Sequence, residues 1–123
     1  MIYLYVGTGG FIGASLRYLI GLIFVNTSGG FPYSTLFVNL SGSFLLAWVT
    51  AGLISRYQLS AKWKAFLGTG LIGSYTTFST LTADAFSLYQ QNSELESLLY
   101  IGVSIGGGFL CSSLGFRLTG RKA

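Results

Sequence analysis

The stretch GLIGSYTTFSTLTAD, residues 70–84, is the most polar run inside a long apolar segment of this chain. Glycine weakens a helix, and serine and threonine hydroxyls compete for backbone hydrogen bonds, so GSYTT (73–77) is a candidate helix break. Within a membrane, a break persists only where protein or an aqueous cavity surrounds it, and its carbonyls are ligands for a hard cation. A helix merely kinked by glycine, with hydroxyls bonded to its own carbonyls, explains the same residues. The sequence leaves both interpretations open.

Two rows of polar side chains recur every three or four residues elsewhere in the chain, so each row shares one helix face. The first row comprises Thr35, Asn39 and Ser43, and the second comprises Tyr100, Ser104, Gly108 and Cys111. Interhelical hydrogen bonding alone explains one such row, whereas two rows beside a broken helix favour a polar path. The donors are neutral hydroxyls and one amide, with Arg17 and Asp84 as nearby charges, and this set suits a small anion rather than a metal ion.

Phe78 directly follows the candidate break. Most aromatic rings in membrane proteins only pack, and that interpretation stays open for this residue. The edge of the ring is nonetheless electropositive, because its quadrupole places negative density on the two faces. In a dry constriction, the edge of Phe78 can therefore contact a strongly hydrated anion.

The composition excludes several kinds of chemistry. The chain has no histidine, which excludes Ser/His/Asp catalysis, and its single cysteine excludes an internal disulfide and a thiolate metal cluster. The run GTGLIG (68–73) matches a dinucleotide-binding pattern, but it lies inside an apolar span and lacks an acidic residue about 20 positions later. We therefore expect no enzymatic activity, and we expect the basic residues near Arg121 to meet anionic lipid rather than nucleic acid.

The elements that must position these residues are membrane-spanning helices. The chain is 51% hydrophobic and only 8% charged, whereas soluble domains are about 25% charged. Four segments reach the roughly 20 residues that a spanning helix needs: 3–25, 33–56, 63–89 and 98–116. Spans of this length without strict alternation exclude a β-barrel. The short connections between them predict one all-α membrane domain over 1–123, with the third span containing the candidate break.

The distribution of charge predicts the topology. Four spans place both termini and the 57–62 connection on one side of the membrane. That side carries the basic residues Arg56, Lys62, Lys64, Arg117, Arg121 and Lys122, and the other side carries Glu94 and Glu96. The positive-inside rule therefore predicts that both termini are cytoplasmic.

Small residues at four-residue spacing predict close packing between helices. The sets are Gly9/Gly13, Gly10/Ala14, Ser43/Ala47/Ala51 and Gly102/Gly106. Because four thin helices enclose little space, we expect the functional unit to be an oligomer.

Three blocks carry a resemblance to a known family: GGFIGASLRY (9–18), TLFVNLSGSF (35–44) and GLIGSYTTFSTL (70–81). In this order within a four-span chain, they resemble the CrcB/Fluc family of fluoride channels. The resemblance covers nearly the whole chain and is weakest in the fourth span. It implies a dimer of oppositely inserted subunits with two fluoride pores along the interface. It also implies that the third helix breaks at 73–77, where the backbone carbonyls of Gly73 and Thr76 from both subunits hold a structural sodium ion.

The resemblance also implies roles for side chains. Phe78 is similar to the first of the family's two pore phenylalanines, and Asn39 to its pore asparagine. Arg17 matches the arginine at the base of an aqueous vestibule, and Asp84 stands where relatives commonly have glutamate near one pore mouth. The residues on or near the polar path are Thr35, Thr77, Ser79, Tyr100 and Ser104.

This sequence departs from the family pattern at one pore position and in one polar row. Leu81 replaces the second pore phenylalanine and has no electropositive ring edge, and Gly108 stands in the row of Tyr100 and Ser104 where some relatives have serine. The one-sided charge is also unusual for a chain that inserts both ways. Some relatives are pairs of unlike subunits, and these departures raise the hypothesis that this chain is one half of such a pair.

The resemblance implies a passive channel in a prokaryotic plasma membrane that exports toxic fluoride from the cytoplasm. Fluoride enters as neutral HF, ionises inside and is trapped until a channel releases it. The alternative is a small dual-topology, proton-coupled exporter of cations or drugs, which needs a buried acid, and only Asp84 approaches that role. A third possibility is a membrane scaffold that transports nothing.

Overall fold

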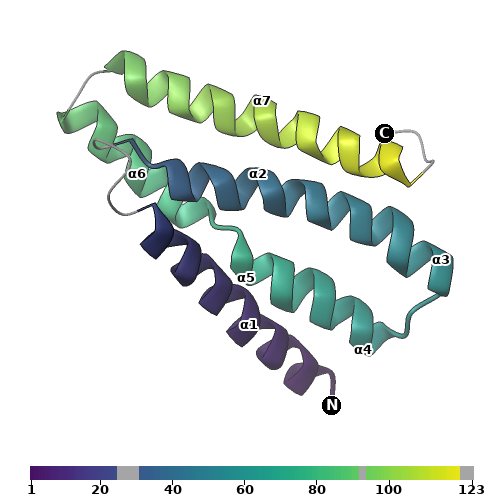
Figure 1. Cartoon of the computed structure of the whole chain (residues 1–123). Helices are drawn as coiled ribbons and strands as arrows, with labels where there is room; N and C mark the ends of the chain where they lie inside the picture. Colours follow the sequence, from purple (N-terminus) through teal and green to yellow (C-terminus); the bar gives the residue numbers. More distant parts are fainter. Residues whose placement is uncertain (25–30, 92–93, 120–123) are drawn as a thin grey trace.

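The computed structural model describes residues 1–24, 31–91 and 94–119, and every regular element in these ranges is helical (Figure 1). The elements in chain order are α1 (Ile2–Ile23), α2 (Tyr33–Trp48), η1 (Val49–Ile54), α3 (Ser55–Tyr57), α4 (Ala61–Lys64), η2 (Ala65–Ile72), α5 (Gly73–Tyr75), α6 (Phe78–Gln91) and α7 (Glu94–Leu118). The two η elements are π-helical turns continuous with their α neighbours. The all-α prediction is therefore confirmed for the described residues.

Three continuous helices are long and apolar enough to cross a membrane: Ile2–Ile23, Tyr33–Tyr57 and Glu94–Leu118. The second begins directly after Pro32, which caps its N-terminus, and ends at Gln58 in the left-handed conformation (φ 48°). The predicted third span contains two shorter helical rods, 61–75 and 78–91. The helices begin and end within a few residues of the predicted segments.

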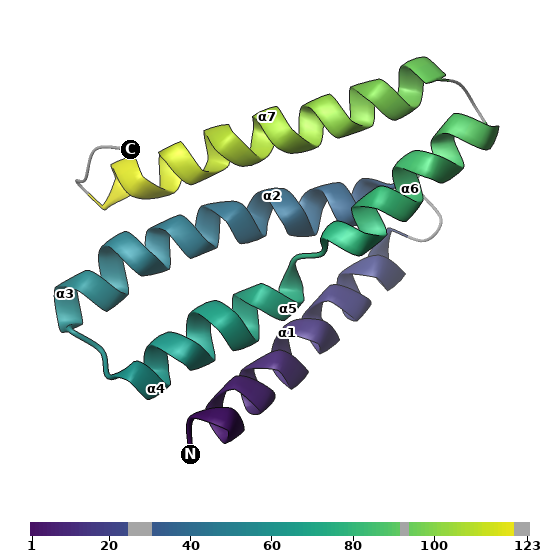
Figure 2. The ribbon, with the colours of Figure 1, turned by 180° about the vertical axis from the view of Figure 1, so that it is seen from behind.

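The helices pack as two pairs, and α6 belongs to the second of them. On one side, α1 lies against η2 and α5, and on the other, α2 lies against α7. Beyond the break, α6 leaves the α1 side and packs on α7, a crossing that is visible from both faces (Figures 1 and 2). The N-terminus, α3, α4 and the last turn of α7 lie at one end of the molecule, so the described basic residues of these elements share that end.

Glycine permits the closest helix contacts. A Cβ on Gly9 would lie 2.5 Å from the carbonyl oxygen of Phe66, and one on Gly13 would collide with the carbonyl oxygen of Leu71. These two glycines therefore let α1 approach η2, as their spacing predicted. Gly102 and Gly106 differ, because a Cβ on either would meet nothing within 4 Å. The close packing predicted for that pair is absent among the described residues of a single chain.

Candidate functional site

The third span is broken rather than kinked. Helix α5 ends at Tyr75, Thr76 is extended (φ −85°, ψ 162°), and α6 begins at Phe78. The break is narrower than the predicted 73–77, because Gly73 is still helical (φ −60°, ψ −35°). The hydroxyl bonding expected of a kink is also present, since the Thr76 Oγ1 hydroxyl donates to the carbonyl of Ile72 at 3.2 Å.

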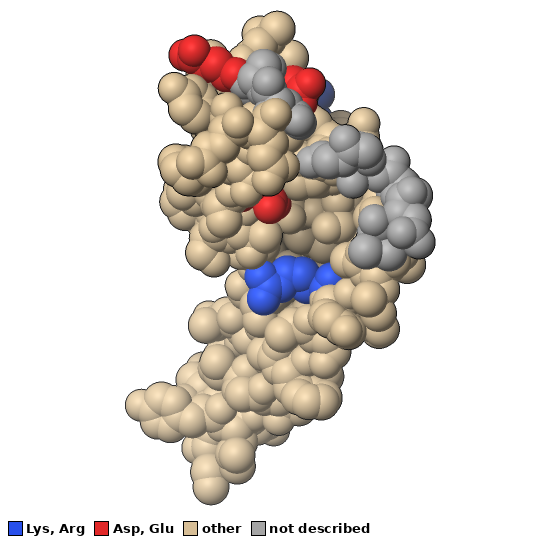
Figure 3. All heavy atoms as spheres, turned by 90° about the vertical axis from the view of Figure 1, so that its left-hand side faces the viewer, with Lys and Arg blue, Asp and Glu red and all other residues tan. Residues whose placement is uncertain are grey.

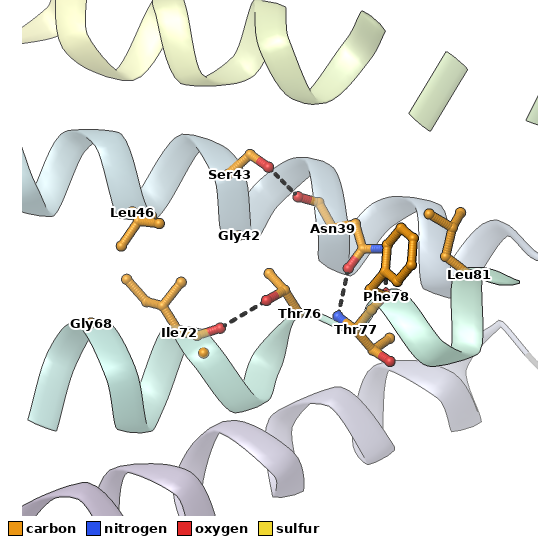
Figure 4. Close-up of a pocket in the computed structure, with 11 residues that line it drawn as sticks. Asn39, Gly42, Ser43, Leu46, Gly68, Ile72, Thr76, Thr77, Phe78 and Leu81 are labelled. Atoms are coloured by element: carbon orange, nitrogen blue, oxygen red, sulfur yellow. Dashed lines mark hydrogen bonds between the residues drawn. The ribbon is translucent and has the colours of Figure 1, made fainter. Parts of the chain in front are cut away.

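The side chain of Asn39 on α2 clamps the broken backbone. Its Nδ2 donates to the carbonyl oxygen of Thr77 at 2.9 Å, and its Oδ1 accepts from the amide of Thr77 at 2.8 Å (Figure 4). One side-chain amide therefore satisfies both backbone groups of a residue that lies outside any helix. Unpaired backbone groups are costly in a membrane, so this clamp makes the break tolerable there.

Two further contacts hold the helix turn before the break. The Ser74 hydroxyl donates to the carbonyl oxygen of Gly10 on α1 at 2.9 Å. The phenol oxygen of Tyr75 lies 2.9 Å from the hydroxyl oxygen of Ser41 on α2. Sequence reasoning did not single out these partners. Ser41 lies outside the two rows of polar side chains, and the sequence identifies Ser74 only as a residue that weakens the helix.

Thr77 also begins the next helix. Its Oγ1 accepts from the amide of Thr80 at 3.1 Å, which is the usual N-terminal cap of a helix that starts at Phe78. The Thr77 hydroxyl also donates to the Thr80 hydroxyl at 3.1 Å and lies 3.4 Å from that of Ser79. Three hydroxyl groups therefore gather at the first turn of α6.

These contacts determine which carbonyls the break releases. In a continuous helix, each carbonyl accepts from the amide four residues later. The amide of Thr77, which would bond the Gly73 carbonyl, donates to Asn39, and the amide of Thr80, which would bond the Thr76 carbonyl, donates to Thr77. Carbonyl oxygens suit a hard cation such as sodium. The Gly73 and Thr76 carbonyls are therefore oxygen ligands of the kind that such an ion takes.

A hollow of about 270 Å³ lies beside the break, between α2 and the third span. Asn39, Thr77, Phe78 and Leu81 meet at one end of it, as Figure 4 shows. Phe78 is 79% exposed, so its ring lies on the surface of the chain. Leu81 is partly buried against a small core that includes Tyr100. The structure therefore brings together the residues of the break and both predicted pore positions of α6.

A second hollow, of about 290 Å³, is lined by Arg17, Thr35, Thr77 and Thr80 among others. The described residues that line it include no carboxylate. Figure 3 shows basic atoms set in a notch of the molecular surface, with an acidic atom close above them. Thr77 lines both hollows, so this residue lies between the space beside Arg17 and the space beside Phe78.

The remaining predicted residues lie away from both hollows. Tyr100 is fully buried, and its hydroxyl donates to Asp84 Oδ2 at 3.3 Å. Ser104, one turn later on α7, is buried and its Oγ has no hydrogen-bond partner among the described atoms. Ser79 is exposed at the start of α6. A buried hydroxyl without a partner is uncommon in native proteins.

Comparisons with known proteins identify the family of this chain. The family model described as CrcB-like protein, Camphor Resistance (CrcB), matches residues 4–116. The chain is 46% identical over 107 residues to the fluoride-specific ion channel FluC 1 of Desulfitobacterium hafniense (strain Y51), which covers 87% of this chain and 93% of that protein. It is 44% identical over 117 residues to the fluoride-specific ion channel FluC 2 of Geobacillus kaustophilus (strain HTA426), which covers 94% and 91%.

A third relative is the fluoride-specific ion channel FluC of Rhizobium meliloti (strain 1021), which is 40% identical over 116 residues, with 94% of this chain and 93% of that protein covered. The family match includes all three sequence blocks, at 9–18, 35–44 and 70–81. Because the matches span almost the whole chain and contain the break that Asn39 clamps, the chain belongs to the CrcB family.

Proposed function

We propose that this protein is a passive, fluoride-selective ion channel in a prokaryotic plasma membrane, where it lets cytoplasmic fluoride leave the cell. The observation that carries this proposal is the clamped break with the exposed ring of Phe78 beside it. Neutral donors and a ring edge share a hollow whose described lining contains no carboxylate, which suits an anion. The names of the relatives, fluoride-specific ion channels, support the same ion.

Fluoride efflux from liposomes that hold only this chain tests the proposal. A fluoride electrode outside the vesicles should record release when the membrane potential is collapsed with an ionophore, and a chloride electrode should record none. Equal release of both anions would contradict selectivity. No ion flux from vesicles that contain folded protein would favour the scaffold interpretation.

The site is open on one side of the chain, which supports a second copy inserted in the opposite orientation. Gly73 and the ring of Phe78 are exposed, so neither the break nor the hollow beside it is closed by the described part of one chain. An antiparallel dimer would place two breaks face to face and close two pores along its interface. Membrane lipid would cover the remaining apolar surface.

The two released carbonyls support a structural sodium ion at the centre of that dimer. The Gly73 and Thr76 carbonyls supply two oxygen ligands from each chain, so two chains supply four. A hard cation needs several oxygen ligands, which one chain alone does not provide here. When bound, the ion would neutralise the carbonyl dipoles and hold the two breaks together.

The polar groups of the chain form a path in which each step replaces part of the hydration shell of fluoride. Arg17 attracts the anion into the second hollow, which the side chains of Thr35 and Thr77 also line. Thr77 then passes it to the hollow of Phe78 and Leu81. The buried hydroxyl of Ser104, with Tyr100 and Ser79, would supply donors on the remaining part of the path.

Replacing Arg17 with alanine should slow fluoride efflux by removing the charge that attracts the anion. The effect should be several-fold at about 0.01 M salt and smaller at about 0.15 M, because the screening length shrinks from about 30 Å to about 8 Å. Efflux measured at both salt concentrations checks this prediction. Arg117→Ala removes the same charge at the end of α7 and serves as the control; an equal salt-dependent loss in the control would contradict a local role for Arg17.

Replacing Asp84 with asparagine separates a channel from a proton-coupled exporter. Asparagine keeps a side-chain oxygen that can accept the 3.3 Å hydrogen bond from Tyr100, so the core around Tyr100 should stay intact. A channel should retain at least about half of its fluoride efflux. An exporter that uses Asp84 as its proton carrier should lose all transport, and that result would reverse the assignment.

A pair of unlike subunits is the second candidate assembly, and Leu81 favours it. Leu81 lines the same hollow as Phe78 but presents no electropositive edge there. The described charges are also one-sided, with Arg56, Lys62 and Lys64 at the end opposite Glu94. Co-purification of a homologous partner with the inverse charge bias would support the pair. Rapid fluoride efflux by this chain alone would contradict it.

A further inference from the structure

A groove separate from the break opens between the start of α1 and the start of the third span. It has a volume of about 260 Å³ and is lined by Leu4, Tyr5, Thr8, Trp63 and Phe66. The Thr8 hydroxyl donates to the carbonyl of Leu4 at 2.7 Å, so the polar atom of that side chain is already satisfied. The rest of the lining is mostly apolar, and Tyr5 and Trp63 each add one polar group to it. The groove therefore suits a hydrocarbon chain rather than a polar solute.

Aromatic rings shape this groove. The ring centroids of Tyr5 and Trp63 are 5.6 Å apart and those of Trp63 and Phe66 are 5.4 Å apart, both in edge-to-face geometry. Trp63 is 47% exposed. Tyrosine and tryptophan concentrate where the hydrocarbon meets the headgroups. The groove thus lies at the depth where a lipid has its glycerol and phosphate.

The ammonium group of a lysine lies at the edge of the groove. The Nζ of Lys62 lies 5.8 Å from the centroid of the Tyr5 ring, which holds the ammonium beside the aromatic cluster. Lys64 and Arg56 lie on the neighbouring α4 and α3, and the acidic first turn of α7 is at the far end of the molecule. This end therefore attracts anions, and its charge is complementary to a phosphate headgroup.

We infer that this groove binds one anionic phospholipid, with an acyl chain between α1 and α4–η2 and the phosphate on Lys62. The site lies on the membrane-facing ends of helices α1 and α4, away from the break, so the inference does not depend on the ion that the protein conducts. Lys64 lies two residues further on and does not share the face of Lys62, because residues at this spacing point to different sides of a helix.

Native mass spectrometry with matched lipids tests the site. Phosphatidylglycerol and phosphatidylcholine with identical acyl chains are titrated against the full chain, and the retained lipid is counted. We expect one tightly bound phosphatidylglycerol per chain, and Lys62→Gln should weaken its binding about tenfold, because it removes a charge-assisted hydrogen bond from the ammonium at the edge of the groove to the phosphate. Lys64→Gln is the matched control, because it removes the same charge from the same helix and should change binding much less.

A second variant tests the contribution of the groove to lipid binding separately from that of the charge. Thr8→Phe fills the groove from the exposed face of α1 and leaves Lys62 in place, so it should remove the bound lipid while the unfolding temperature stays within a few degrees of the parent. Binding of soluble glycerol phosphate as tight as that of the lipid would show an ion site without a lipid groove. Equal retention of phosphatidylcholine, or equal losses in Lys62→Gln and Lys64→Gln, would overturn the inference.

Discussion

Replacing Phe78 with isoleucine is expected to reduce fluoride efflux by at least a hundredfold while the protein remains folded. The ring of Phe78 is 79% exposed beside the break and makes little contribution to the core of the chain. Isoleucine keeps the apolar bulk but has no quadrupole, so it presents no electropositive edge to an anion. A hundredfold loss corresponds to a barrier to passage that is about 3 kcal/mol higher without the ring edge, since 1.4 kcal/mol corresponds to tenfold.

The matched control is Phe86→Ile. Phe86 lies two turns further along α6, is 60% exposed and does not line the hollow. Liposome efflux of both variants, normalised to the amount of folded protein, should show a loss in Phe78→Ile alone. Unchanged flux in Phe78→Ile would remove Phe78 from the pore, and equal losses in both variants would indicate that exposed rings on α6 serve only for assembly.

Replacing Asn39 with alanine is expected to lower both stability and flux, because it removes the clamp. The amide and the carbonyl of Thr77 lose their partners at 2.8 and 2.9 Å together. A group left unpaired costs about 1–3 kcal/mol, and because only the Thr77 carbonyl stays without a partner, the free energy of unfolding should fall by about 1–3 kcal/mol. The freed Thr77 amide can then bond the Gly73 carbonyl, which would remove one of the two proposed sodium ligands. Thermal unfolding with and without sodium measures the loss of stability and the loss of the sodium ligand, and liposome efflux measures the loss of flux.

Ser43→Ala is the control for the clamp. Ser43 lines the same hollow one turn after Asn39, and its hydroxyl donates only to the carbonyl of Asn39 within its own helix, at 2.8 Å. Its loss should therefore change stability by less than about 1 kcal/mol. An Asn39→Ala protein that unfolds at the parent temperature in every sodium concentration, but conducts nothing, would show that Asn39 meets fluoride directly and does not clamp the break.

Much of the fold could be predicted from local sequence. The apolar segments, the start of α2 after Pro32 and the interruption of the third span all follow from composition and from helix-weakening residues close together in the chain. Burial of Gly9 and Gly13 followed in the same way from their spacing. The packing expected at Gly102 and Gly106 is not found within the described part of one chain. The spacing of small residues shows that a helix face is smooth, but it does not show that a neighbour of the same chain covers that face.

The candidate site could likewise be predicted only in part from the sequence. The sequence by itself determined which residue types take part in the chemistry, because they depend only on side-chain identity and helical period. They are neutral donors, one aromatic ring after the break and an arginine within α1. Which carbonyls the break releases was decided only by the tertiary structure. Asn39 is 38 residues away from Thr77 in the chain, and its amide takes the backbone groups of Thr77 only because α2 packs beside the third span. The local sequence 73–77 contains donors enough to bond its own carbonyls, and the contact with α2 decides the competition by offering Thr77 a pair of well-placed hydrogen bonds at once.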